Sequence, residues 1–370
     1  MNNDSIATGI RFGATAKPEH AREAVAAAME KAKLSNAASV ILFLTNGYAQ
    51  QPQAAITAAA KQASTLQVYG CTAAGLFSEQ EWLLDVEGAV AMVFPNECAL
   101  EPASVLASRE QLTRNMPLFC LTSPQSSNIA INQWDQGMIG AISSNEYGQG
   151  DFPIWQASRL SKTGFIHAGF AADLQCDIAV SQGIRRLSKN QIISTSYNNC
   201  IQSVDGLPAA QSLQKALPEN VYDMFLEQPY HTLCAQSENS SGEGLNNGFF
   251  KLNNVVAIDQ EEQSIYLSGS AKKGRHIFWA LRDRSLAKQE MKHNLQSLQK
   301  SIKAPKFALI FSSISRGPYF YGEQDCDLQL FQQHFPEVPL IGIYSTGEIS
   351  PGSHYAALSR RYSSVIAVYS

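Results

Sequence analysis

The sequence has few charged side chains and no long apolar run. Asp, Glu, Lys and Arg make up 16% of its 370 residues, against 45% for hydrophobic residues, so we expect a globular protein of two or more domains. The formal net charge of −4 gives no basic excess for holding a phosphate backbone, which argues against nucleic acid as a partner. No apolar run long enough to span a bilayer is present, and the N-terminus lacks the features of a signal peptide. We therefore expect a cytoplasmic protein with no membrane partner.

Several common chemical motifs are also missing. The seven cysteines contain no C-x-x-C pair, so the pattern predicts reduced, mostly buried thiols and excludes a zinc ribbon or disulfide framework. The chain has no H-E-x-x-H, P-loop or G-x-S-x-G motif. It has no C-x-x-C-H either, so haem attached covalently in the usual way is not expected.

One pattern occurs twice, near the start and near the end of the chain. ASVILFLTNG and KFALIFSSISRG each read as a strand that ends in turn residues. A helix-like segment follows each, then LQVYGCTAAGLFS or VPLIGIYSTGEIS, and then the apolar strand GAVAMVFP or SSVIAVYS. Gly70 and Gly75 of the first copy have the same spacing as Gly342 and Gly347 of the second. The repetition predicts a duplicated module with an insertion, because a solenoid would need three or more short repeats.

These patterns define the expected architecture. We predict an α/β fold of two related α/β modules with mixed sheets and flanking helices, packed together as an internal duplication. The first domain is expected to span residues 1–225 and the second residues 226–370. Helices are also predicted from Pro18 and from Asp205, and a flexible loop from Gln236.

The paired glycines allow two interpretations. A glycine at a strand end permits a tight turn or a close backbone approach. Such turns in α/β proteins are where small ligands tend to bind, and two related turns can line one pocket. A tight turn needed only for packing is the alternative, and the spacing alone does not decide between them.

Several segments of the sequence resemble segments of a known protein family. The chain is similar to FIST-domain proteins, with a FIST N-terminal domain followed by a FIST C-terminal domain. FSSISRGPYFYG, with Arg316 and Gly317, and VPLIGIYSTGEISP, with Gly347 and Glu348, resemble segments of the C-terminal domain. VYGCTAAGLFS resembles the Gly-Cys-Ser/Thr segment of the N-terminal domain, and FIHAGFAADL and the Asp205-Gly206 pair also fit.

The chain departs from the family pattern at three positions. Leu76 stands where the family usually has a glutamate, Ser313 where cysteine is common, and Ser315 in place of a glycine. If these positions contact a ligand, the specificity of this chain is unusual.

The resemblance implies a sensory input module that binds small ligands such as amino acids. Its partner would be a signalling protein such as a histidine kinase or a cyclase-type output, and some members are reported to carry haem and sense nitric oxide. We predict a non-catalytic sensor. An enzyme, a haem-based gas sensor and a pure interaction scaffold are the alternatives.

The candidate ligand-binding residues come from both glycine segments and from the strand end before Arg316. They are Gly70, Cys71, Thr72, Gly75, Ser312, Ser313, Arg316, Gly317, Tyr344, Gly347 and Glu348. Arg316 offers a fork of donors that suits a carboxylate, and Glu348 would take an ammonium, so the two predict a clamp for a zwitterion. An Arg316–Glu348 ion pair without ligand is the alternative.

Cysteine, histidine and paired carboxylates give weaker signals. Cys71 is either a reactive thiol or a small buried residue that fits a tight turn. An enzyme would use Cys71 or the Ser312–Ser313 strand end. His167 and His231 have apolar neighbours and are candidate haem ligands, but no motif assigns haem to either, and a core or surface role is favoured. Asp325 and Asp327 can bind a cation or, as we expect, cap the next helix.

Overall fold

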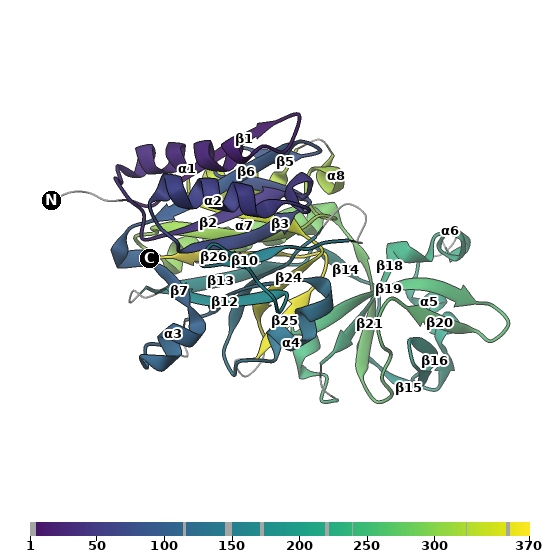
Figure 1. Cartoon of the computed structure of the whole chain (residues 1–370). Helices are drawn as coiled ribbons and strands as arrows, with labels where there is room; N and C mark the ends of the chain where they lie inside the picture. Colours follow the sequence, from purple (N-terminus) through teal and green to yellow (C-terminus); the bar gives the residue numbers. More distant parts are fainter. Residues whose placement is uncertain are drawn as a thin grey trace. The chain divides into compact units, whose positions relative to one another are not determined.

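The computed structural model describes residues 5–113, 116–144, 150–170, 174–218, 222–238, 240–322, 324–352 and 356–370. The chain divides into two compact units: unit 1 comprises Met1–Ser181 and Glu290–Ser370, and unit 2 comprises Gln182–Gln289. The predicted α/β class is confirmed, with helices and several mixed sheets (Figure 1). The compact units do not coincide with residues 1–225 and 226–370, and the domain boundary near residue 225 stays a prediction.

Unit 1 contains three copies of one strand order. The first copy has β1 (Ala7–Gly13), α1 (Pro18–Ala32), β2 (Ser39–Thr45), α2 (Pro52–Ala63), β3 (Val68–Ala73) and β6 (Glu87–Phe94). The second has β7 (Leu100–Pro102), α3 (Ala103–Ser108), β8 (Leu118–Thr122), α4 (Ser127–Ile131), β9 (Met138–Ile142) and β12 (Phe165–Phe170). The third has β13 (Cys176–Ser181), α7 (Arg284–Ser301), β22 (Phe307–Ser313), α9 (Cys326–His334), β23 (Leu340–Ser345) and β26 (Ser364–Tyr369).

The pairing of the strands is the same in every copy. The central pairs β2–β3, β8–β9 and β22–β23 are parallel. The last strand of each copy runs antiparallel to the first central strand and to the opening strand of that copy. Unit 2 is inserted in the third copy, between β13 and most of α7. The predicted duplication is therefore present, but it is two parts of a threefold repetition.

Each copy also contributes a hairpin to the sheet of another copy. The hairpins are β4 (Gly75–Ser78) with β5 (Trp82–Leu84), β10 (Ile154–Gln156) with β11 (Arg159–Leu160), and β24 (Gly347–Pro351) with β25 (Ala357–Arg360). They pair with β23, β3 and β9 respectively. The exchange is cyclic and completes three six-stranded sheets, whose orders are β1-β6-β2-β3-β10-β11, β7-β12-β8-β9-β24-β25 and β13-β26-β22-β23-β4-β5.

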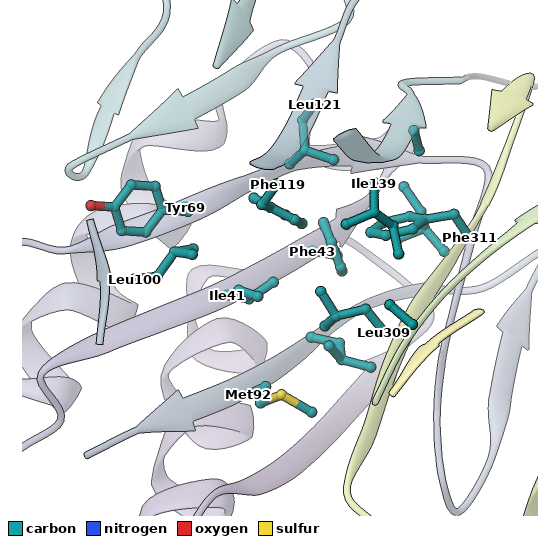
Figure 2. Close-up of a cluster of buried hydrophobic side chains, with 14 of the residues drawn as sticks. Ile41, Phe43, Tyr69, Met92, Leu100, Phe119, Leu121, Ile139, Leu309 and Phe311 are labelled. Atoms are coloured by element: carbon teal, nitrogen blue, oxygen red, sulfur yellow. The ribbon is translucent and has the colours of Figure 1, made fainter. Parts of the chain in front are cut away.

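The three sheets share one apolar core. Alternate residues of the central strands point to the same side of each sheet, and those of all three sheets belong to one buried cluster. Figure 2 shows Phe43 of β2, Phe119 of β8 and Phe311 of β22 in this cluster. The ring centroids of Phe43 and Phe119 lie 6.5 and 6.1 Å from that of Phe311. The opposite faces of the first and third sheets pack against α1 and α2, and against α7 and α9.

One glycine in each copy is fixed by the closeness of the central strands. Gly70, Gly140 and Gly342 occupy corresponding places in β3, β9 and β23. A Cβ atom at these positions would lie 1.7, 1.7 and 2.4 Å from a carbonyl oxygen of the neighbouring strand. Packing alone thus accounts for the first glycine of each predicted pair.

Unit 2 is a closed antiparallel barrel. Its strands are β18 (Thr232–Ser237), β19 (Phe250–Asp259), β20 (Ser264–Leu267), β16 (Cys200–Val204), β15 (Gln191–Tyr197) and β21 (His276–Arg282), and the barrel closes because β21 pairs with both β15 and β18. Strands β14 (Ile184–Arg186) and β17 (Leu207–Pro208) add to β21 and β16. Helix α5 (Ala209–Ala216) contributes to its core, and α6 (Tyr222–Glu227) follows.

Two local predictions in unit 2 need correction. The helix predicted from Asp205 begins at Ala209, because Asp205 and Gly206 form the left-handed turn, with φ of 49° and 78°, that joins β16 to β17. The loop predicted from Gln236 begins later, since Gln236 and Ser237 complete β18. The helix predicted from Pro18 is confirmed as α1.

Candidate functional site

The carboxyl ends of the three parallel strand pairs meet in unit 1. The Ser144 hydroxyl donates to the Tyr344 carbonyl at 2.9 Å and accepts from the Ala74 amide at 3.1 Å. The Ser143 hydroxyl donates to the Thr72 carbonyl at 2.7 Å. These bonds join the ends of β3, β9 and β23. Strand ends of this kind are where open α/β sheets bind ligands.

A row of hydroxyl groups crosses the third sheet at this level. Ser181 of β13 pairs with Ser364 of β26, Ser364 with Ser312 of β22, and Ser312 with Tyr344 of β23. Residues directly opposite one another in a sheet point to the same face. Tyr344 belongs to the cluster that packs against α7 and α9, so the row lies on the helix-covered face. We call Ser181, Ser364, Ser312 and Tyr344 the hydroxyl row.

Arg316 lies at one end of the hydroxyl row. Its side chain is 1% exposed, and its Nε lies 2.7 Å from the Asp327 carboxylate. Its Nη1 donates to the Ser181 carbonyl at 2.9 Å, and its Nη2 donates to the Ser181 hydroxyl at 2.7 Å. Burial by itself lowers the pKa of this guanidinium, but the charge and hydrogen bond of Asp327, together with Tyr321 and Glu290, outweigh that effect, so the pKa is raised and the group stays charged.

Asp325 lies at the other end of the row. Its carboxylate accepts from the Leu328 amide at 2.9 Å, which caps α9, and from the Tyr344 hydroxyl at 2.5 Å. Burial, with the neighbouring charge of Asp327, raises the pKa of Asp325 to about 6. The helix cap expected of the Asp325–Asp327 pair is found at Asp325, whereas Asp327 pairs with Arg316 and accepts from the Tyr321 hydroxyl at 2.7 Å.

The middle of the row is chemically unsatisfied. The Ser312 residue is 2% exposed and the Ser364 residue 0% exposed. Their hydroxyl oxygens make no hydrogen bond to any residue that the structure describes. Buried hydroxyls are almost always paired, and leaving one unpaired costs about 1–3 kcal/mol. The unpaired hydroxyls of Ser312 and Ser364 are adjacent and lie between the buried Arg316 and the buried Asp325. They could each form a hydrogen bond with a bound molecule.

Glu348 of β24 is fully buried beside the end of β23. Its carboxylate accepts from the Ser345 hydroxyl at 3.0 Å and from the hydroxyl and amide of Ser363 at 2.6 and 3.2 Å. Burial raises the pKa of Glu348 to about 7, and these bonds and the charge of Arg316 oppose the shift. Each charge has its own partner: Arg316 pairs with Asp327, and Glu348 is held by serines. Neither the open clamp nor the mutual ion pair inferred from the sequence is the arrangement found.

The first glycine segment reaches the same place from another copy. Gly75 begins β4 and pairs with Tyr344, so the two glycine segments lie side by side in the third sheet. Thr72 is fully buried, and its hydroxyl has no partner among the described residues. Leu76, the departure from the family pattern, packs in the shared core. That the two segments line one pocket stays a prediction.

The remaining candidates fill close-packed positions. A Cβ atom at Gly317 would lie 2.6 Å from the Tyr344 ring, so this ring packs directly against the Gly317 backbone. Gly347 pairs with Ile142 of β9, and the buried Ser313 pairs with Ser345. Cys71 is fully buried, and burial raises the pKa of its thiol. That environment favours the structural interpretation of Cys71 over a reactive thiol.

His167 and His231 each have a hydrogen-bond partner in the structure. His167 is 7% exposed, and its Nε2 lies 2.9 Å from the Ala130 carbonyl. Burial lowers its pKa to about 4. The His231 side chain is exposed and hydrogen-bonds to Gln228. Among the described residues no group of three or more Cys, His, Asp and Glu side chains is placed to hold a metal ion.

The sequence interpretation missed several residues of this site. Ser143 and Ser144 lie in MIGAISSN, which matches LIGIYSTG in spacing but has Asn where the other copies have their second Gly. Ser364 is the first residue of β26. In the sequence, the two serines of SSVIAVYS look like turn residues that precede a strand. Ser181 is 135 positions from Arg316 along the chain, and no local pattern connects them.

The comparisons with known proteins show the family of this chain. The FIST N domain matches residues 38–207 and the FIST C domain matches residues 209–351. The chain belongs to the FIST family, whose domains are associated with sensory signal transduction. It is also similar to two uncharacterised proteins of Mycobacterium tuberculosis, MT0656 of strain CDC 1551 / Oshkosh and Rv0628c of strain ATCC 25618 / H37Rv. Each is 22% identical over 373 residues, covering 94% of this chain and 96% of the relative.

The family domains cut across the compact units. The barrel of unit 2 takes β14 to β17 from the FIST N match and β18 to β21 from the FIST C match. In unit 1 the FIST N match supplies β4 to a sheet otherwise centred on β22 and β23. In the part of the chain that the structure describes, every helix is too short or too polar to cross a bilayer.

Proposed function

We propose that this chain is a non-catalytic, small-ligand-binding sensory protein, and that its ligand binds against the hydroxyl row between Arg316 and Asp325. The observation that carries the proposal is the pair of buried, unpaired hydroxyls of Ser312 and Ser364. Hydroxyls, a guanidinium and a carboxylate suit a small polar molecule such as an amino acid or a similar metabolite. The output passes to a separate signalling protein, such as a histidine kinase or a cyclase.

The charges of the site limit what Arg316 does for the ligand. Its guanidinium is already bound to Asp327 and Ser181, so it orients the row and supplies positive potential. Asp325 and Tyr344 hold the other end. The ligand groups that pair with the row are therefore hydrogen-bonding groups that face Ser312 and Ser364.

The test begins with native mass spectrometry of the freshly purified protein, beside the same sample denatured. A mass lost on denaturation gives the size of a bound molecule and separates haem from a ligand the size of an amino acid. A panel of amino acids and related metabolites is then screened by thermal shift. Recovery of the ligand with unchanged mass after incubation distinguishes sensing from turnover.

Matched variants locate the site. The double variant Ser312→Ala/Ser364→Ala is expected to keep the fold and to lose the ligand-induced thermal shift. Ser39→Ala serves as the control. Ser39, in the first sheet, is equally buried, but its hydroxyl accepts a 2.8 Å hydrogen bond from the Leu100 amide. The control variant is expected to lower stability and to keep the thermal shift. An undiminished shift in the double variant would rule out binding at the row.

A further inference from the structure

A groove opens on the surface of unit 1 between α2 and the β10–β11 hairpin. It has a volume of about 550 Å³, and its lining includes Gln53, Lys61 and Leu66 on one side and Ser158 and Arg159 on the other. The groove is distinct from the hydroxyl row, which lies on the third sheet.

The hairpin wall of the groove is held rigidly. Its two turn residues, Ala157 and Ser158, have φ of 50° and 61°, a left-handed turn usually built with Asn and Gly. Ser158 donates from its amide to the Val68 carbonyl at 3.1 Å and from its hydroxyl to the Leu66 carbonyl at 2.7 Å, and its carbonyl accepts from Gln53 at 3.0 Å. These bonds fix a strained turn against the body of the unit.

Comparison between the copies shows that the hairpin beside this groove is less covered than its counterpart in the third sheet. Leu160 of β11 and Trp82 of β5 occupy corresponding places, since their hairpin partners Trp155 and Phe77 pair with Gly70 and Gly342. Trp82 packs against the apolar cluster under α7 and α9. Leu160 is 42% exposed, and nearby Leu66 is 72% exposed. The same position is thus covered in the third sheet and open in the first.

The polar lining selects the kind of partner. Lys61 and Arg159 are both exposed, and the groove lining contains no acidic residue, although the chain as a whole carries a net charge of −4. Strand β11 ends the first sheet, and both of its residues are exposed. An edge strand offers main-chain hydrogen bonds to an added strand, and flanking pockets and charges choose its sequence.

We propose that this groove docks an extended acidic segment of a partner protein, which runs along β11, places apolar side chains on Leu66 and Leu160, and pairs its carboxylates with Lys61 and Arg159. This goes beyond ligand sensing, since it assigns a surface for a macromolecular partner. It does not require that the hydroxyl row bind a ligand.

The experiment is a selection from a phage-displayed library of random linear peptides on the full chain, followed by fluorescence anisotropy of the enriched peptides. We expect enriched peptides to interleave acidic and apolar residues. The variant Lys61→Glu/Arg159→Glu is expected to weaken their binding roughly tenfold or more, through loss of attraction and like-charge repulsion. Leu160→Ser, which leaves the charges in place, is expected to weaken binding as well.

The control is Lys251→Glu/Lys273→Glu, which changes the net charge equally at exposed positions of unit 2. It is expected to leave binding within about twofold, since charge elsewhere on the surface is screened at physiological salt. The proposal would be overturned if every enriched peptide bound Lys61→Glu/Arg159→Glu as tightly as it bound the wild type. Enrichment of neutral or basic peptides would also overturn it. Circular dichroism of every variant verifies the fold.

Discussion

Arg316 holds Ser181 through both its backbone and its side chain, at 2.9 and 2.7 Å. Ser181 is the last residue before the chain enters unit 2, and its hydroxyl donates at 3.1 Å to Glu290, the first residue after the chain returns. The Arg316 guanidinium thus contacts Ser181, which belongs to the hydroxyl row and is itself hydrogen-bonded to Glu290.

Removing the Arg316 side chain should be costly. Arg316→Met leaves the buried Asp327 carboxylate unpaired, and we expect a loss of about 3–5 kcal/mol in the free energy of unfolding, measured by urea denaturation. The exposed Arg22–Glu23 pair, at 3.2 Å, is the control, and Arg22→Met should cost less than about 1 kcal/mol. Arg316→Met/Asp327→Asn should recover part of the loss. Equal effects of Arg316→Met and Arg22→Met would contradict the buried pair.

The unpaired hydroxyls predict an unusual result for Ser312→Ala. Removing a buried hydroxyl that has no partner should leave ligand-free stability unchanged or raise it, by up to about 1 kcal/mol. Ser39→Ala should instead lower stability by about 1–3 kcal/mol, since it leaves the Leu100 amide unpaired. Thermal and urea unfolding of both variants measure the difference. A clear destabilisation by Ser312→Ala would mean that its hydroxyl is paired in the ligand-free protein.

The contribution of Glu348 to stability should fall as the pH rises from about 4.5 to 7, whereas His167, whose pKa burial lowers from 6.5 to about 4, contributes in the opposite direction between those two values. The pKa of Glu348 is raised from 4.5 in the unfolded chain to about 7 in the folded protein, so the folded state binds more protons in that range and loses stability on deprotonation. The effect of a shift of this size is about 3 kcal/mol. Asp325, with a pKa raised to about 6, acts in the same direction at the lower end.

Glu348→Gln isolates this contribution. The variant should lack the downward contribution to stability between about pH 4.5 and 7, where Glu348 is protonated in the folded protein and ionised in the unfolded chain. Urea unfolding at several pH values provides the measurement, and Glu23→Gln, at an exposed position, is the control. An unchanged slope in Glu348→Gln would show that the carboxyl group does not titrate there.

Cys71 should react slowly with a thiol-directed alkylating reagent in the folded protein. Its thiol is fully buried, and burial raises its pKa, so little thiolate is accessible near neutral pH. The partly exposed Cys326 serves as the internal control and should be labelled first, as followed by peptide mass spectrometry. Rapid labelling of Cys71 in the native protein would restore the enzyme hypothesis.

Gly140 should not tolerate a side chain. A Cβ atom there would lie 1.7 Å from the Cys120 carbonyl oxygen, so Gly140→Ala must push apart the central strands of the second sheet, at a cost of about 1–3 kcal/mol or more. Gly137→Ala, three positions earlier, is the control, because its Cβ would lie 3.4 Å from the nearest atom. Comparable unfolding midpoints for the two variants would contradict the close packing of β8 and β9.

The sequence predicted the α/β class and the strands that contain Gly70 and Gly342, because these rest on local signals, although the strands run past the glycines to Ala73 and Ser345. Apolar periodicity and turn residues are read within a few positions of one another. The second copy was not recognised in the sequence because its helices, Ala103–Ser108 and Ser127–Ile131, are short and its second glycine is replaced. The partners of Arg316 could not be read from the chain, since a guanidinium can pair with any carboxylate that the fold brings near.

By itself, the sequence determined the family and the first and third copies. Only the tertiary structure decided that each hairpin joins the sheet of another copy, that the barrel of unit 2 interrupts the third copy, and that Ser181, Ser312, Ser364 and Tyr344 form one row. The physical reason is that strand pairing and buried ion pairs depend on distance in space. Register between strands hundreds of residues apart is fixed by packing around a shared core, and no local pattern records it.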